Sequence, residues 1–68
     1  MITNQILEQM AKVRESGFAN IFSRSEVMDT ANRLELTELF IWLLVNKKYY
    51  GDLLIAFEEY SKNGKSPD

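Results

Sequence analysis

The sequence contains neither cysteine nor histidine, and these two absences exclude several kinds of chemistry. Without cysteine the chain has no disulfide, no thiolate metal site and no cysteine nucleophile. Without histidine it lacks the usual general acid or base near neutral pH and the usual nitrogen ligand of zinc. We therefore expect no enzymatic activity, no catalytic residues, no bound cofactor and no metal site.

The chain also lacks an excess of positive charge, because 8 lysines and arginines stand against 10 acidic residues, for a net charge of -2. Nucleic-acid binders usually carry a basic excess that neutralises phosphates, so nucleic acid is not the expected partner. The longest apolar run, 39–45, is far shorter than the roughly 20 residues that span a bilayer, and residues 1–10 lack a secretion signal. We expect no membrane association and a cytoplasmic location in a host cell.

Glycine and proline are scarce, so few positions interrupt a helical pattern. They are Gly17, Gly51, Gly64 and Pro67. Together with the apolar periodicity they predict helices at about 4–16, 24–35 and 38–46, and a last one from 49 or 52 to 62. We interpret 1–64 as a single helical domain and 65–68 as a flexible tail.

Local signals mark the ends of the first two predicted helices. Thr3 or Asn4 is suited to cap the start of the first helix, and Gly17 is placed to end it in the left-handed conformation. Ser23 and Glu26 have the spacing of a capping box, which predicts the start of the second helix.

Three large apolar residues, Phe18, Ile21 and Phe22, occupy the joint between these two helices. Because such side chains are costly to expose, we expect them to fill the core where the helices meet. Phe22 is also placed to pack on Val27 as a hydrophobic staple.

The run 39–45 is apolar at every position, and Thr37 is suited to cap a helix there. A helix that is apolar on all sides is usually buried on all sides. A strand is the alternative, but no second run of strand type is available to pair with it. The sequence therefore predicts an all-α fold, a small compact bundle of three to four helices with this apolar third helix at its centre.

Pairs of carboxylates, such as Glu58 with Glu59 or Glu35 with Glu38, could in principle perform acid–base chemistry. Such work requires a cleft that shifts their pKa values. We favour the simpler interpretation, in which both pairs lie on solvated helix surfaces.

The C-terminal half is rich in aromatic residues, which are enriched at protein interfaces. The candidate interface residues are Trp42, Tyr49, Tyr50 and Tyr60. For Trp42 we favour a core position. For Tyr49 and Tyr50 core and interface remain equally open.

Several segments of the chain form a pattern of their own: Val13-Arg14-Glu15-Ser16-Gly17, Asn20-Ile21-Phe22, Val27, Ala31, Leu34, Glu38-Leu39 and Asn46-Lys47-Lys48-Tyr49. This pattern resembles a domain-of-unknown-function family of small phage and prophage proteins of Gram-positive bacteria. The resemblance covers 13–54, and it implies a phage-related origin and a helical fold but no activity. The chain departs from the family pattern at Ser23, where Asp is common, at 35–37, where a Met-Gly-Phe-like joint is usual, and after Leu54.

We carry two functional hypotheses forward from the sequence. The first is a non-enzymatic protein–protein interaction module that acts on a host or phage protein, with a homodimer left open. The alternative is a DNA-associated transcriptional regulator, because the second helix, the tight joint and the third helix resemble a helix-turn-helix. A recognition helix needs polar and basic side chains, whereas the third helix is apolar, so the first hypothesis is preferred.

Overall fold

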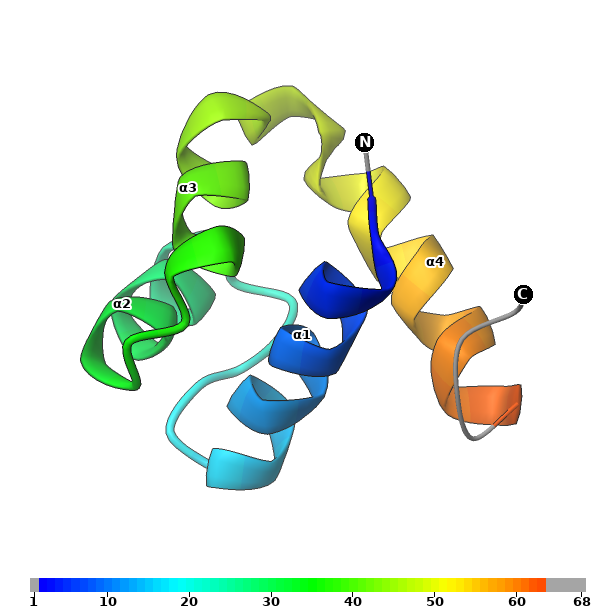
Figure 1. Ribbon diagram of the computed structural model, residues 1–68, viewed down its shortest axis with the longest axis horizontal. Helices are drawn as coiled ribbons and strands as arrows, with labels where there is room; N and C mark the ends of the chain where they lie inside the picture. The colour runs from blue at the N-terminus through cyan, green and yellow to red at the C-terminus, as the bar shows by residue number, and fades with distance from the viewer. Residues whose placement is uncertain (1, 64–68) are drawn as a thin grey trace.

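The computed structural model describes residues 2–63, which form four α-helices and one short 3-10 helix and contain no strand (Figure 1). The elements are α1 (Asn4–Ser16), α2 (Arg24–Arg33), α3 (Thr37–Val45), η1 (Lys47–Tyr49) and α4 (Tyr50–Asn63). The predicted all-α bundle is confirmed. α1 contacts each of the other three α-helices, with α2 and α3 packed on one side and α4 on the other. The predicted tail, 65–68, and the stop at Gly64 lie outside the described residues.

Both ends of α1 form as the local sequence predicts. The Thr3 Oγ1 accepts a hydrogen bond from the Ile6 N–H at 3.2 Å. Gly17 adopts φ 75°, and its N–H donates to the Arg14 carbonyl at 3.3 Å. A residue with a Cβ would be strained at this left-handed φ, so glycine at this position ends the helix.

α2 begins with half of the predicted capping box. The Ser23 Oγ accepts from the Glu26 N–H at 3.4 Å. The Glu26 carboxylate reaches beyond Ser23 and accepts from the Asn20 N–H at 2.9 Å, so it orders the joint before the helix. The Asn20 Oδ1 in turn accepts from the Phe22 N–H at 3.0 Å, a local turn of the kind that asparagine favours.

The predicted packing of this joint is wrong for two of its three apolar residues. Ile21 packs against the core, but the Phe22 side chain is 75% exposed and Phe18 is 60% exposed. The staple between Phe22 and Val27 is therefore absent, although Val27 is fully buried. The Asn20 turn directs the chain so that only Ile21 faces inward, since successive residues of a short turn cannot all point to one side.

The joint between α2 and α3 is a Schellman motif built without glycine. The Leu36 N–H donates to the Ala31 carbonyl at 2.8 Å and the Glu35 N–H donates to the Asn32 carbonyl at 3.2 Å. Glu35 occupies the left-handed position of the motif with φ 60°. α2 consequently ends at Arg33 rather than at Glu35, where the apolar pattern predicts its end. The motif stores strain at Glu35, because a Cβ disfavours this backbone conformation.

Replacing Glu35 with glycine is expected to stabilise the protein by about 0.5–1 kcal/mol, because the gain at the left-handed φ exceeds the entropy that glycine adds to the unfolded chain. The free energy of unfolding in urea measures the effect. Glu15→Gly in the last turn of α1 is a matched control, and it is expected to destabilise by about 0.5–1 kcal/mol. A loss of stability in Glu35→Gly would contradict the proposed strain.

α3 is capped at its N-terminus by a side chain from α1. Thr37, the predicted cap, lies inside the helix, and Leu36 at the N-cap position makes no side-chain capping bond. Instead, the Leu39 N–H donates to the Gln9 Oε1 at 2.8 Å, and the Gln9 Nε2 donates to the Glu38 Oε1 at 2.9 Å. A buried polar side chain thus satisfies one of the unpaired amides that every helix start leaves.

The C-terminal end of α3 is held by a side chain from α2. The Arg24 Nη1 donates to the Leu43 carbonyl at 3.2 Å and to the Met28 Sδ at 3.1 Å. A guanidinium at this end is favourable, because the helix dipole places partial negative charge on the last carbonyls. α3 is therefore fixed at both ends by residues of other helices.

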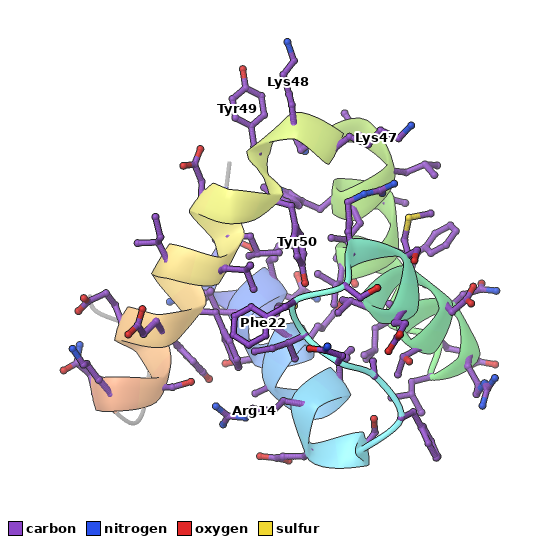
Figure 2. All side chains as sticks on the ribbon, turned by 180° about the vertical axis from the view of Figure 1, so that it is seen from behind. Arg14, Phe22, Lys47, Lys48, Tyr49 and Tyr50 are labelled. Atoms are coloured by element: carbon purple, nitrogen blue, oxygen red, sulfur yellow. The ribbon has the colours of Figure 1, made fainter. Side chains whose placement is uncertain are left out.

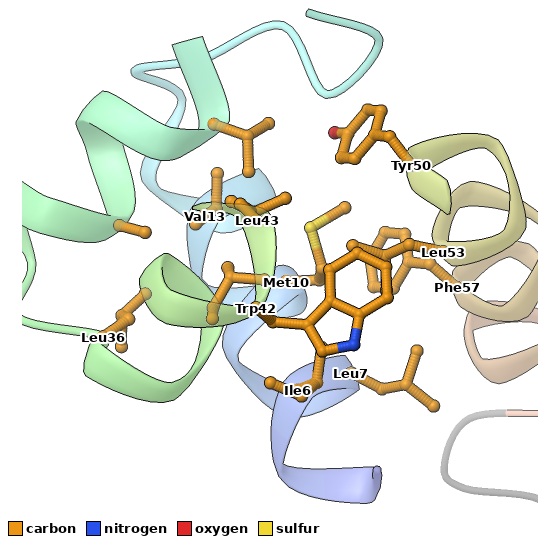
Figure 3. Packing of buried hydrophobic residues seen from close by; sticks show 13 residues of the cluster. Ile6, Leu7, Met10, Val13, Leu36, Trp42, Leu43, Tyr50, Leu53 and Phe57 are labelled. Carbon is orange, nitrogen blue, oxygen red and sulfur yellow. The ribbon is translucent and has the colours of Figure 1, made fainter. Parts of the chain in front are cut away.

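The core joins all four α-helices around the apolar stripe of α1 (Figure 3). Its buried hydrophobic residues are Ile6, Leu7, Met10, Val13, Val27, Ala31, Leu36, Leu39, Trp42, Leu43, Tyr50, Leu53 and Phe57. Gln9 and Thr30 are the buried polar residues of the described part. The expected core position of Trp42 is thus observed.

Candidate functional site

The structure does not bring the four predicted interface residues together on one surface. Trp42 and Tyr50 are buried, Tyr60 is half-buried, and Tyr49 is half exposed. The Tyr60 ring stacks on the Phe57 ring at a centroid distance of 6.2 Å. Figure 2 shows Tyr49 projecting from the turn between α3 and α4, whereas Tyr50 points inward. Their contact with a partner stays a prediction, and Tyr49 offers the most surface for it.

Tyr50 ties α4 to the joint between α1 and α2, because its hydroxyl donates a hydrogen bond to the Ile21 carbonyl. Burial raises the pKa of the Tyr50 phenol to about 12, while the positive charge of Arg24 acts in the opposite direction. The neutral phenol is therefore the form that the fold requires.

The raised pKa of Tyr50 predicts a loss of stability in strong alkali. The unfolded chain releases the phenol proton near pH 10 and the folded chain near pH 12, so the stabilisation is complete below pH 10 and falls as the pH rises toward 12. The tyrosinate absorbance of the wild type minus that of Tyr50→Phe should show a midpoint about 2 units above the ordinary value. A midpoint at the ordinary value would contradict the burial of this phenol.

α3 is exposed along one side, contrary to the predicted burial on all sides. Ile41, Leu44 and Val45 are 52%, 54% and 72% exposed. They follow the i, i+3, i+4 spacing of one helix surface, opposite the fully buried Leu39 and Leu43. α3 packs on α1 and α2 only from one side, and four short helices cannot enclose it. We call the surface formed by Ile41, Leu44 and Val45 the α3 face.

A hollow of about 400 Å³ lies beside the α3 face, between α3 and the start of α1. Its α3 wall includes Ile41, Val45 and the buried Trp42, and its α1 wall includes Gln5 and Ile6. The α3 face is thus a ridge of apolar side chains next to a depression whose walls include further apolar side chains.

The two ends of α3 carry opposite charges. Glu35 and Glu38 are exposed before and within its first turn, and Lys47 and Lys48 are exposed directly after its last turn. Figure 2 shows both lysines projecting from that end of the molecule. Hydrogen bonds from Gln9 and from the backbone lower the pKa of Glu38, so its carboxylate is ionised at neutral pH.

A second apolar surface lies between α4 and the joint that precedes α2. A hollow of about 370 Å³ is lined by Ile21, Phe22, Leu54 and Ile55, among other residues. The Ile55 side chain is 64% exposed, and Phe22 stands in front of α4 and α1 in Figure 2. We call this hollow the Phe22 surface.

Polar side chains surround the Phe22 surface. Arg14, Glu58 and Ser61 line the same hollow. The Arg14 guanidinium lies 4.9 Å from the centre of the Phe57 ring, and its Nη1 donates to the Ser61 Oγ at 2.9 Å. Arg14 is therefore held in place across α1 and α4 before any partner binds.

The acidic residues singled out for acid–base chemistry lie at the surface. Glu58, Glu59, Glu35 and Glu38 are all exposed. Within residues 2–63, no group of three or more Asp, Glu, His or Cys side chains is arranged to hold a metal ion. None of the helices in that part of the chain has the length and apolar character needed to cross a membrane.

The apolar surface residues escaped sequence analysis for different reasons. In α3 the spacing of Ile41, Leu44 and Val45 was visible, but the run is apolar throughout, so no contrast distinguished outer from inner positions. At the Phe22 surface, Phe22 and Ile55 come from distant segments, and only the folding of α4 against α1 brings them together.

The fold and its surfaces define a small all-α protein whose prominent surface features are patches of exposed apolar side chains. The family model described as "Domain of unknown function (DUF5049)" matches residues 2–56, and the chain belongs to this family. The match spans α1 to α3 and the first half of α4. It confirms the expected membership of a domain-of-unknown-function family. No curated protein and no solved structure matches the chain.

Proposed function

We propose that this chain is a non-enzymatic protein–protein interaction module of phage or prophage origin that acts on a host or phage protein in the host cytoplasm. The observation that supports it is the Phe22 surface. A phenylalanine 75% exposed beside an isoleucine 64% exposed is costly in water, and such patches are typical of binding sites. The motif resemblance at Asn20-Ile21-Phe22 and Glu38-Leu39 supports the phage origin.

The Phe22 surface has the anatomy of a protein interface. Apolar side chains form its centre, and Arg14, Glu58 and Ser61 form a polar edge. Interfaces commonly combine a desolvated apolar centre with a polar rim, and arginine and aromatic residues are enriched at their energetic centres. Because Arg14 is already held by Phe57 and Ser61, little side-chain entropy is lost when a partner binds.

The chemistry of this surface specifies the kind of partner. The hollow accepts a large apolar side chain, and the charges of Arg14 and Glu58 among its lining residues favour a partner that carries both a carboxylate and a cation beside that side chain. No buried side-chain nitrogen or oxygen in the described part lacks a hydrogen-bond partner. The lining of the hollow offers apolar contact together with charged side chains.

A matched pair of substitutions tests this proposal. Phe22→Gln removes the centre of the surface, while Phe18→Gln removes another exposed phenylalanine of the same joint that does not line the hollow. Immobilised wild type and both variants are compared in lysate of the bacterium that carries the gene, and any retained protein is purified for calorimetry. We expect one stoichiometric partner that binds the wild type and Phe18→Gln alike, and at least about tenfold more weakly to Phe22→Gln.

Two outcomes would contradict the proposal: no protein is retained, or the partner binds Phe22→Gln as well as the wild type. Circular dichroism of both variants controls for folding, and both should keep the wild-type helical signal because the two side chains lie at the surface.

The DNA-binding alternative rests on the order of α2, a tight joint and α3. Phosphate and base contacts require cations and polar groups on the outer side of the second of these helices. Here that side carries the apolar α3 face together with Glu38, so the protein-binding proposal is preferred. A gel shift at low salt, where phosphate attraction is strongest, measures DNA binding directly.

A further inference from the structure

The α3 face is an apolar ridge that no segment of the described chain covers. Ile41 lies at its N-terminal end, with Leu44 and Val45 one turn further along. It is separate from the Phe22 surface, because the two hollows share no lining residue. A molecule bound to the α3 face therefore does not occupy the site proposed above for the protein partner.

The surroundings of this ridge are complementary to the ridge itself. The hollow beside it, with a volume of about 400 Å³, is walled by Ile41, Trp42 and Val45 on α3 and by Ile6 on α1. A contact between two copies about a two-fold axis uses the same patch on both, so the patch must offer both a projection and a depression. The α3 face and its hollow meet this requirement.

The charges along α3 select the orientation of such a contact. Acidic Glu38 lies in its first turn and basic Lys47 and Lys48 follow its last turn. Parallel helices would place like charges together, whereas antiparallel helices bring each acidic end to the partner's basic end. The helix dipoles favour the same antiparallel arrangement.

The register follows from the spacing of these residues. A two-fold axis midway between Ile41 and Leu44 pairs each of them with the other on the second copy. α3 ends at Val45, and Lys47 and Lys48 follow in the 3-10 helix η1. The same axis therefore brings the first turn of each α3, which carries Glu38, beside the segment that carries the two lysines of the other copy, so that apolar contacts at the centre and opposite charges at both ends occur together.

We propose that the α3 face binds a second copy of this chain, forming a two-fold symmetric dimer with the two α3 helices antiparallel. This inference goes beyond the proposed function and does not depend on the Phe22 surface. A typical interface buries about 800 Å² per partner, a substantial part of the 4522 Å² surface of this chain. Three exposed side chains and their immediate rim cover less than that, so the dimer is weak, with a dissociation constant of about 10 μM to 1 mM.

Sedimentation equilibrium of the full chain tests the surface. From about 10 μM to about 1 mM the wild type should shift from the 7.9 kDa monomer toward twice that mass. Leu44→Gln should weaken the dimer at least about tenfold, because the symmetry removes the side chain twice. Phe18→Gln is the matched control and should dimerise as the wild type does, since Phe18 is exposed to a similar degree elsewhere.

Disulfide cross-linking tests the orientation of the two α3 helices. Because the chain has no native cysteine, only the introduced cysteines can form disulfides. Thr37→Cys and Lys48→Cys are purified separately and mixed in a glutathione redox buffer. The antiparallel register predicts a disulfide between position 37 of one copy and position 48 of the other. Disulfides joining two copies of the same variant should be minor, because antiparallel helices place the equivalent positions of the two copies at opposite ends of the contact, beyond disulfide reach.

Three results would contradict the proposed dimer. A wild type that stays monomeric at about 1 mM, a dimer unaffected by Leu44→Gln, or a mixture dominated by same-position disulfides overturns it. If Leu44→Gln loses its helical signal, Val45→Gln replaces it, since Val45 is the most exposed residue of the α3 face. A monomer that still binds a partner through Phe22 contradicts only the dimer, and a dimer without any other partner contradicts only the proposed function.

Discussion

Replacing Leu43 with alanine is expected to lower the free energy of unfolding by about 2–5 kcal/mol, the cost of lost burial plus the cavity that remains. Leu43 is fully buried on the inner side of α3, and its carbonyl accepts the hydrogen bond from Arg24. A domain of this size has a total stability of about 3–10 kcal/mol. The substitution is therefore expected to remove a large share of that stability.

Leu44→Ala provides a matched control, because the neighbouring leucine is 54% exposed. Its expected cost is below about 1 kcal/mol, as for most surface substitutions. Urea denaturation followed by circular dichroism measures both variants, at a concentration low enough that any dimer has dissociated. Equal losses in the two variants would show that α3 is buried on both sides and would contradict the observed orientation of the helix.

Removing the Gln9 side chain is expected to cost about 1–3 kcal/mol, because Gln9→Ala leaves the buried Leu39 N–H without its acceptor. Gln9 also donates to Glu38, and this bond is the largest cause of the lowered pKa of the Glu38 carboxyl. The variant should therefore show a pKa for Glu38 closer to its ordinary value in an NMR titration.

The sign of the associated pH dependence follows from the same bond. A carboxyl whose pKa is lower in the folded state stabilises the fold above its unfolded pKa, and this contribution is lost as the pH falls through the folded value. Gln9→Ala should therefore lose less stability on acidification than the wild type does. Gln5→Ala, one turn earlier on α1 and exposed, is the control and should change neither quantity. A pKa of Glu38 that stays low in Gln9→Ala would contradict the role of Gln9.

Sequence reasoning predicted both ends of α1 and the start of α2, which depend on neighbouring residues, but it did not predict the end of α2 at Arg33 or the start of α3. Thr3 and Gly17 bound α1, and Ser23 begins α2, because a cap needs only a side chain and an amide two or three residues away. The all-α class followed from apolar spacing and the few helix-interrupting residues. These features rest on interactions within one or two helical turns.

The candidate surfaces were only partly visible in the sequence. The aromatic residues pointed to Tyr49 and Tyr50 together, yet Tyr49 faces outward while Tyr50 donates to the Ile21 carbonyl, which lies 29 residues earlier. Phe22 was expected in the core and is instead the centre of an exposed patch with Ile55. Adjacent residues of similar chemistry, such as Tyr49 and Tyr50, therefore lie in opposite environments, and no local sequence pattern distinguishes the buried residue from the exposed one.

The apolar periodicity and the scarcity of glycine and proline determined a helical protein, and the absence of cysteine and histidine determined that it has no thiol or imidazole chemistry. Only the tertiary structure decided which side of the apolar run 39–45 is buried and what caps it. Gln9 and Arg24 reach α3 from other helices and hold its two ends, so they select the side that packs on α1 and α2. The physical reason is that a uniformly apolar helix has no preferred face of its own, and the contacts that orient it come from residues distant in the chain.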